Sequence, residues 1–171
     1  KETDMSKEIT LAKAGLSNCE ELYQLQTISF RQLLEKYQDY DSNPGAETKD
    51  RTLQRLKDPF TDYYFICLSG KHIGAVRISH FETLCRLKQL FILPEFQGHG
   101  YAQQAILLAE ALYPEIQRWE LDTISQEAKL CHLYEKMGYT KTGRMEKIKD
   151  GMDLVYYARH TKRAGSGCRQ S

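Results

Sequence analysis

The stretch Ile92–Gln103 (ILPEFQGHGYAQ) is the part of the sequence that decides the fold. It ends an apolar run typical of a strand, carries Gly98 and Gly100 in a turn, and leads directly into a segment with helical periodicity. The first N–H groups of a helix lack intrahelical partners and carry a partial positive charge, and glycines let backbone amides approach an anion closely. The stretch therefore predicts a cradle for phosphate or pyrophosphate, formed by the backbone of residues 97–102.

Two common phosphate-binding motifs do not match this stretch in full. A Walker A loop ends in Gly-Lys-Ser/Thr, and His99-Gly100-Tyr101 does not match it. A dinucleotide-binding fingerprint matches Gly98 and Gly100 and has Asp122 downstream, but its third small residue would fall on Gln103. Because the preceding strand also closes a run of three strands, where that fold requires a βαβ unit, an NAD-dependent oxidoreductase is the weaker alternative.

Outward from this stretch, the sequence predicts one α/β domain over residues 1–160 and a basic, disordered tail over residues 161–171. The expected strands are 9–12, 63–68, 73–79, 85–93, 119–124, 139–146 and 152–159, and the expected helices are one from about 19 to 34, then 47–57, 100–113 and 127–137. Ser17 is the expected N-cap of the first helix. The second to fourth strands follow one another without a helix, which predicts an antiparallel meander.

Composition and charge exclude several classes of protein. Lys plus Arg (24) nearly equals Asp plus Glu (23), so the formal net charge is +1 and nothing indicates a nucleic-acid partner. No apolar stretch approaches the ~20 residues that span a bilayer, so no membrane partner is expected. Residues 1–4 precede Met5, which is a candidate for the native start.

Five cysteines lie dispersed along the chain, without a CxxC motif or zinc-type Cys/His spacing. This pattern predicts reduced thiols, a cytoplasmic location and no metal. Cys67 and Cys85 lie within apolar runs and are expected in the core.

Two motifs together resemble one family. Gln97-Gly98-His99-Gly100-Tyr101-Ala102 fits the Q/R-x-x-G-x-G/A signature of the GNAT acetyltransferases, preceded by the hydrophobic-x-Pro at residues 92–94. Residues 133–139 (LYEKMGY) resemble the family's LYEKxGF motif. The resemblance covers approximately residues 9–160 and is sharpest over 87–142.

The resemblance implies a fold and a reaction. The fold is a mixed sheet of about seven strands flanked by about four helices, with antiparallel second to fourth strands and with the fourth and fifth strands splayed at a bulge. The reaction is transfer of an acetyl group from acetyl-CoA to a primary amine, by direct attack in a ternary complex. Members of the superfamily often pair through exposed sheet edges, which leaves homodimer formation open.

The resemblance also implies roles for particular residues. The coenzyme A pyrophosphate would bind the backbone of Gln97, Gly98, His99, Gly100, Tyr101 and Ala102, and the pantetheine arm would pair with Leu90, Phe91 and Ile92. An N–H near Phe91 or Ile92 would stabilise the oxyanion. Tyr134 would act as general acid for the leaving thiolate, a role that suits a phenol of ordinary pKa ~10.

One position departs from the family pattern. Many relatives carry an Asn seven residues before the tyrosine, where it contacts the cofactor, whereas this chain has Glu127. Gln126 is the neighbouring amide that would replace that contact. His99 is expected to face solvent, and His132 is expected to be a surface or partly packed histidine.

The acceptor is the least determined part. The sequence does not identify the general base, and its candidates are Glu82, Glu120 and Asp122. The loop 37–46 would suit a cationic amine, and Tyr40, Asp41 and Asp122 are the candidate substrate contacts. A small molecule is the expected acceptor. A protein lysine or N-terminus, or a coenzyme A-binding module without catalysis, remain alternatives.

Overall fold

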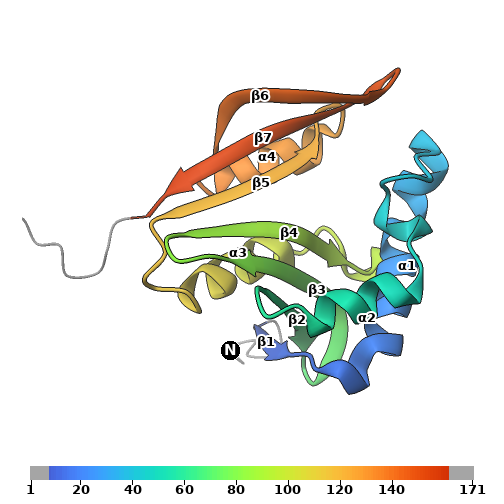
Figure 1. The fold of residues 1–171 in the computed structure, drawn as a ribbon, viewed down its shortest axis with the longest axis vertical. Coiled ribbons are helices and arrows are strands. Elements are labelled where there is room, and N and C mark those ends of the chain that lie inside the picture. Colours follow the sequence, from blue (N-terminus) through green and yellow to red (C-terminus); the bar gives the residue numbers. More distant parts are fainter. Residues whose placement is uncertain (1–7, 162–171) are drawn as a thin grey trace, which may run out of the picture.

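A seven-stranded mixed sheet with the order β1-β2-β3-β4-β5-β7-β6 runs through the protein, in a computed structural model that describes residues 8–161 (Figure 1). The strands are β1 Ile9–Lys13, β2 Thr61–Leu68, β3 Lys71–His80, β4 Leu84–Ile92, β5 Arg118–Ile124, β6 Thr140–Lys149 and β7 Met152–His160. The helices are α1 Cys19–Tyr37, α2 Lys49–Lys57, α3 Tyr101–Ala111 and α4 Ala128–Lys136. The predicted fold class is confirmed.

The predictions for residues 1–4 and for the tail beyond Thr161, which includes Cys168, lie outside the described residues. Within them, the prediction for Ser17 is wrong. A short 3-10 turn spans Leu16–Asn18, so Asn18 is the N-cap of α1, and its side chain accepts a hydrogen bond from the N–H of Gly15 at 2.9 Å.

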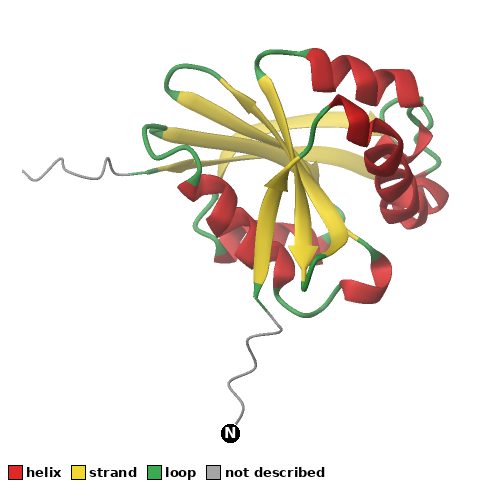
Figure 2. Cartoon of the chain, turned by 90° about the horizontal axis from the view of Figure 1, so that it is seen from below, coloured by secondary structure: helices red, strands yellow, loops and turns green. Residues whose placement is uncertain are grey.

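Helices cover both faces of the twisted sheet (Figure 2). Helix α1 packs on one face, where Leu22 and Leu25 join Tyr63, Phe65 and Phe91 in a buried cluster. A second cluster lies on the other face, under α3 and α4, and it contains Ile106, Tyr134, Trp119, Leu121, Val155 and Tyr157. Cys67 and Cys85 are buried, as predicted. A third cluster, which contains Ile66, Ile73 and Ile92, packs against Tyr101 and Ala105 of α3. The alternation of strand side chains thus buries apolar residues on both faces of the sheet.

The predicted meander is present, and the sheet opens beside it. β2, β3 and β4 pair antiparallel in sequence order. β4 then pairs in parallel with β5 at three positions only, from Leu84 opposite Arg118 to Arg86 opposite Glu120. Beyond them the two strands diverge (Figure 1). The splay that the family resemblance implied is therefore confirmed.

A β-bulge lies where the splay begins. Arg77 pairs with Gln89 and Ile78 with Leu87, so Lys88 has no opposite residue on β3. Leu87 and Leu90 both pack in the cluster under α3 and α4. The extra residue therefore places two consecutive polar side chains, Lys88 and Gln89, on the opposite face of the sheet.

Candidate active site

The turn before α3 has the backbone conformation that its glycines predict. Gly98 and Gly100 have φ of +81° and +80°, in the left-handed region that other residues rarely adopt. Gly100 is the N-cap of α3, and within residues 8–161 no side chain caps the first N–H groups of this helix. The His99 side chain is exposed, as expected, and its ring centroid lies 5.5 Å from that of Tyr101. The helix start thus offers its amides to an external anion.

A groove of about 650 Å³ runs from this turn along the open edge of β4. Its walls come from α1, β4, the glycine turn and α4. The lining includes Phe30, Leu33, Lys36, Leu90, Phe91, Ile92, Gln97, Gly98, Gly100, Tyr101, Ala102, Glu127, Leu130 and Tyr134. Eight of the ten residues predicted to bind the cofactor therefore line one groove, together with Tyr134. The exceptions are His99 and Gln126.

The end of β4 presents backbone groups to the groove. The Leu93 N–H donates to the carbonyl of Ile73 at 2.8 Å, which fixes the side of β4 that faces β3. Because antiparallel pairing alternates, Leu90 and Ile92 direct their N–H and C=O groups away from β3, into the gap beside β5. The Gln97 side chain donates a hydrogen bond from Nε2 to the Ile92 carbonyl at 2.9 Å, so this carbonyl already has a partner. Of the two oxyanion donors expected, the Ile92 N–H is the one that this alternation leaves available.

Tyr134 projects from α4 into the same groove. Its ring is buried and packs edge-on against Tyr139, with centroids 6.2 Å apart. Burial, followed by the charge of Asp122, raises the pKa of Tyr134 above its usual value. Among the described residues, none forms a hydrogen bond with its hydroxyl. A phenol in this state stays protonated at neutral pH and has a free proton to donate.

Glu127 is the polar side chain that the groove receives in place of an amide. Its Oε2 accepts hydrogen bonds from Lys36 Nζ and Tyr37 Oη of α1, each at 2.6 Å. Desolvation alone would raise the pKa of Glu127, but these two hydrogen bonds outweigh it and lower the pKa below its usual value. The carboxylate is therefore ionised and paired across the groove.

Gln126 does not reach the groove. Its Nε2 donates to Asp153 Oδ2 at 2.7 Å, and its Oε1 accepts from the Asp153 N–H at 2.9 Å. This pairing ties the start of α4 to β7. The structure thus does not bring Gln126 together with the other predicted cofactor-binding residues, since Glu127 and not Gln126 lines the groove.

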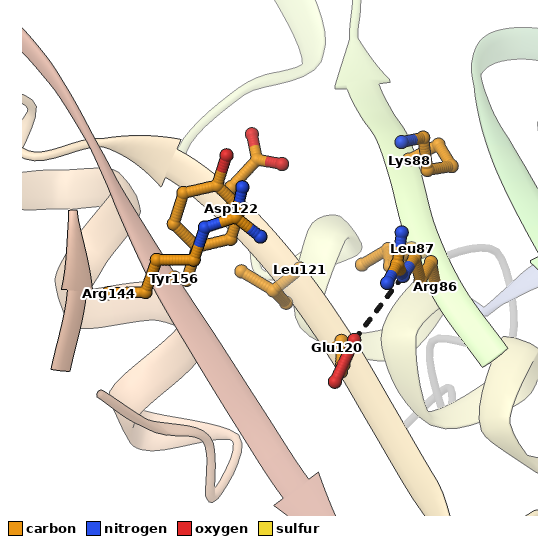
Figure 3. A pocket seen from close by; sticks show the side chains of 8 residues that line it. All are labelled: Arg86, Leu87, Lys88, Glu120, Leu121, Asp122, Arg144 and Tyr156. Carbon is orange, nitrogen blue, oxygen red and sulfur yellow. Dashed lines mark hydrogen bonds and ion pairs between the residues drawn. The ribbon is translucent and has the colours of Figure 1, made fainter. Parts of the chain in front are cut away.

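A second, smaller pocket of about 150 Å³ opens between β4 and β5 on the other face of the sheet (Figure 3). Arg86 and Lys88 lie on one side of the gap, and Asp122, Arg144 and Tyr156 lie on the other. The polar residues of this pocket come from four strands, which is why no local pattern in the sequence predicted Lys88, Arg144 or Tyr156.

The three candidate bases have different surroundings. Glu120 accepts hydrogen bonds from Arg118 at 2.8 Å and Arg86 at 3.3 Å, and these lower its pKa. Glu82 lies in the β3–β4 hairpin and lines neither pocket. Asp122 lines the small pocket, and desolvation by the surrounding strands raises its pKa although Lys88 opposes the shift. Asp122 is thus the best placed of the three, because it lines the pocket and, among the described residues, has no arginine hydrogen-bonded to it.

The predicted acceptor loop lies apart from both pockets. Tyr40 is 66% exposed and Asp41 is also exposed, and neither lines the groove or the small pocket. In the same loop, Asp39 accepts a hydrogen bond from the Ser42 N–H at 3.2 Å, and Asn43 accepts one from the Gly45 N–H at 2.7 Å. The polar residues there form turns. The structure does not bring Tyr40 and Asp41 together with Asp122.

A groove with an uncapped helix start, an unpaired strand edge and a buried tyrosine agrees with the comparison to protein families. The model described as "Acetyltransferase (GNAT) family" matches residues 19–139, which is more than half of the chain. The chain belongs to the GNAT acetyltransferase family. A search of curated proteins found no match.

Solved structures share the fold at low sequence identity. The ribosomal-protein-S18-alanine N-acetyltransferase of Escherichia coli superposes with a TM-score of 0.75 at 12% identity, over 94% of this chain and 98% of that chain. The spermidine N-acetyltransferase of Vibrio cholerae, in complex with CoA and spermine, gives 0.72 at 18% identity, over 91% and 96%. The PaiA N-acetyltransferase of Thermoplasma acidophilum, in complex with coenzyme A, gives 0.71 at 15% identity, over 90% and 99%. These neighbours establish the architecture and leave the acceptor open.

Residues 8–161 contain neither a membrane-spanning helix nor a metal-binding group. No helix there combines the length and apolar character needed to cross a membrane. No three His, Cys, Asp or Glu side chains in that range gather as a metal-binding group.

Proposed function

We propose that this protein transfers an acetyl group from acetyl-CoA to the primary amine of a small molecule, by direct attack in a ternary complex. The observation that carries the proposal is the continuity of one groove, in which Gly98, Gly100, the open edge of β4 and Tyr134 all line a single space. A diphosphate, an extended amide-bearing arm and a thioester require these three kinds of surface in this order.

The chain's own groups suit coenzyme A. The amides from Gln97 to Ala102 would bind the diphosphate, because the helix start carries partial positive charge and has no side-chain cap. The free N–H and C=O of Leu90 would pair with the amides of the pantetheine arm as a neighbouring strand does. Coenzyme A complexes of structural neighbours support this assignment.

The transfer step follows from the residues around the end of β4. A neutral amine forms the new C–N bond, and the Ile92 N–H stabilises the negative charge that develops on the thioester carbonyl oxygen. As the C–S bond breaks, Tyr134 donates its proton to the leaving sulfur, and the nitrogen releases its extra proton to solvent as the amide forms, while the Tyr134 oxygen regains a proton from solvent. Asp122, on the other face of the split, receives the proton that the acceptor ammonium must lose before attack.

Calorimetric titration with acetyl-CoA, NAD and ATP tests the cosubstrate. Binding of acetyl-CoA alone, competed by coenzyme A, is the expected result, and tight NAD binding without affinity for acetyl-CoA would overturn the proposal. Thiol release is then measured over a panel of small amines, lysine peptides and peptides with free N-termini. Faster turnover of peptides would replace the small molecule by a protein acceptor. Binding without turnover of any amine would leave a coenzyme A-binding module.

A further inference from the structure

The small pocket between β4 and β5 contains more positive than negative charge that is free to bind a ligand. Its carboxylates are Glu120 and Asp122, and its cations are Arg86, Lys88 and Arg144. Glu120 is already ion-paired with Arg86 at 3.3 Å and with Arg118 at 2.8 Å. Asp122 is therefore the only carboxylate of this lining that stays available, beside two cations, Lys88 and Arg144.

Lys88 lacks a counter-ion at contact distance. Among residues 8–161 it forms no hydrogen bond or ion pair, although the bulge places it at the mouth of the split. Desolvation, followed by the charge of Arg77, lowers the pKa of Lys88, and the opposing charge of Asp122 only partly compensates. An ammonium held in this position is stabilised by any anion that enters the pocket.

Arg144 is the second available cation. Its guanidinium stacks over the ring of Tyr156 at 4.2 Å from the centroid, and it has no carboxylate partner within the described range. The hydroxyl of Tyr156 donates to Glu146 at 2.8 Å, which fixes the ring beneath the guanidinium. Arg144 is thus held at the pocket with its donors unused, and a planar guanidinium matches the geometry of carboxylate and phosphate.

Buried groups behind Lys88 add to the positive potential. Arg77 and Gln89 are 8% and 6% exposed and lie opposite each other on β3 and β4. Neither Arg77 Nε nor either amide atom of Gln89 has a hydrogen-bond partner among the described residues. Desolvation and the charge of Arg55 lower the pKa of Arg77 to about 10. An uncompensated buried cation next to the pocket favours an anionic ligand over a cationic one.

We propose that the acceptor is an amine that also carries a carboxylate or phosphate, with Asp122 binding the ammonium while Lys88 and Arg144 bind the anionic group. This inference rests on the proposed acetyl transfer and specifies its substrate class. A polycationic amine would instead be repelled by Lys88, Arg144 and the field of Arg77. The pocket is smaller than those that enclose drug-sized ligands, so it takes the reacting end of the acceptor and leaves the remainder outside.

Matched acceptor pairs test the inference. 2-Aminoethyl phosphate is compared with 2-aminoethanol, and β-alanine with its amide, so that each pair differs in the anionic group and the two pairs separate phosphate from carboxylate. Spermidine represents the cationic class. Binding is measured by calorimetry, with and without coenzyme A, and transfer is measured by thiol release with acetyl-CoA. The proteins are the wild type, Lys88→Gln, Arg144→Gln and Lys141→Gln, where Lys141 is an exposed lysine of β6 outside the pocket.

In at least one pair, the anionic member is expected to bind the wild type and Lys141→Gln at least tenfold more tightly than its neutral partner. Lys88→Gln and Arg144→Gln lose most of this preference and keep their affinity for acetyl-CoA. Equal or tighter binding of the neutral amines or of spermidine overturns the inference, as does a preference that survives both substitutions. A preference in binding without any acetyl transfer supports this pocket and removes only the transferase assignment.

Discussion

The two faces of the split between β4 and β5 are built in different ways. On the face under α3 and α4, the groove depends on backbone groups of a continuous run of chain, from Leu90 to Ala102, completed by Tyr134. On the opposite face, the small pocket depends on side chains from four strands, including Lys88, Asp122 and Arg144.

Because of this difference, the two faces place different demands on the sequence. Backbone amides at a helix start need only glycines at fixed spacing, which leaves a recognisable pattern in the sequence. A side-chain pocket assembled across a sheet has no such spacing and can change its chemistry by single substitutions. The groove lies on the first face, under α3 and α4, and we expect substitutions there to affect cosubstrate use. The small pocket lies on the second, opposite face, and we expect substitutions there to affect the acceptor.

The largest effect is expected for Tyr134→Phe. Loss of the phenolic proton removes general-acid assistance to the leaving thiolate, and kcat should fall by about 100-fold or more. Affinity for acetyl-CoA, measured by calorimetry, should stay within about twofold because the ring still fills its place in the core.

Tyr139→Phe is the matched control for Tyr134→Phe. Its hydroxyl is buried without a hydrogen-bond partner among the described residues, and it lies outside the groove lining. The control should keep kcat unchanged. A normal kcat in Tyr134→Phe would remove this tyrosine from the mechanism and leave the first face with a purely binding role.

Asp122→Asn is the corresponding test of the second face. At neutral pH the value of kcat/KM should fall by about thirtyfold, since the ammonium loses its counter-ion and its proton acceptor, while solvent can still take the proton. The loss should shrink as the pH rises toward ~10, where the free amine predominates.

The pH at which activity is lost on acidification tests the direction of the pKa shift of Asp122. Desolvation raises its pKa, so wild-type kcat/KM should decline on acidification at a higher pH than the usual aspartate value of ~4. Asp41→Asn, at the exposed loop after α1, should behave as the wild type. An effect of Asp41→Asn as large as that of Asp122→Asn would move the acceptor site to the loop.

Gly100→Ala tests the backbone character of the cofactor side. A Cβ at this position meets no atom within 4 Å, so the cost comes from the φ of +80° and amounts to about 1 kcal/mol in the free energy of unfolding. Relaxation of that strain would turn the first amides of α3 and weaken acetyl-CoA binding by about tenfold.

Gly15→Ala is the control for the glycine substitution. It also has no neighbour within 4 Å, but its φ is −117°, which any residue adopts. Unfolding in urea and calorimetry with acetyl-CoA should therefore give wild-type values. Equal affinities of Gly100→Ala and the wild type for acetyl-CoA would show that the turn does not bind the diphosphate.

The features of the fold that depend on local chemistry could be predicted from the sequence. The meander follows from three strands without a helix between them, and the turn geometry follows from Gly98 and Gly100. The predicted N-cap at Ser17 was wrong because a 3-10 turn moved the helix start by one residue to Asn18. Boundaries of this kind depend on competition between caps a residue apart.

The rest of the candidate site depends on long-range contacts. The bulge at Lys88 is visible only from the pairing of β4 with β3, and the contact between Lys36 and Glu127 joins residues 91 positions apart. The direction of Gln126 was set by Asp153 on β7, which no pattern around residue 126 indicates. Gln126 and Glu127 are neighbours with similar local preferences, and their tertiary partners decide which of the two lines the groove.

The smallest effect is expected where an ion pair closes the groove. Lys36→Met leaves the Glu127 carboxylate unpaired beside an anionic cosubstrate, and acetyl-CoA should bind about threefold more weakly, since exposed ion pairs contribute little. The double variant Lys36→Met/Glu127→Gln removes both charges and should recover wild-type affinity, so the two substitutions are not additive. Lys49→Met breaks an exposed ion pair with Glu20 away from the groove and is the control. Additive losses in the double variant would mean that Glu127 contacts the cosubstrate directly, as the amide does in relatives, and that the cofactor side also relies on a side chain of its own.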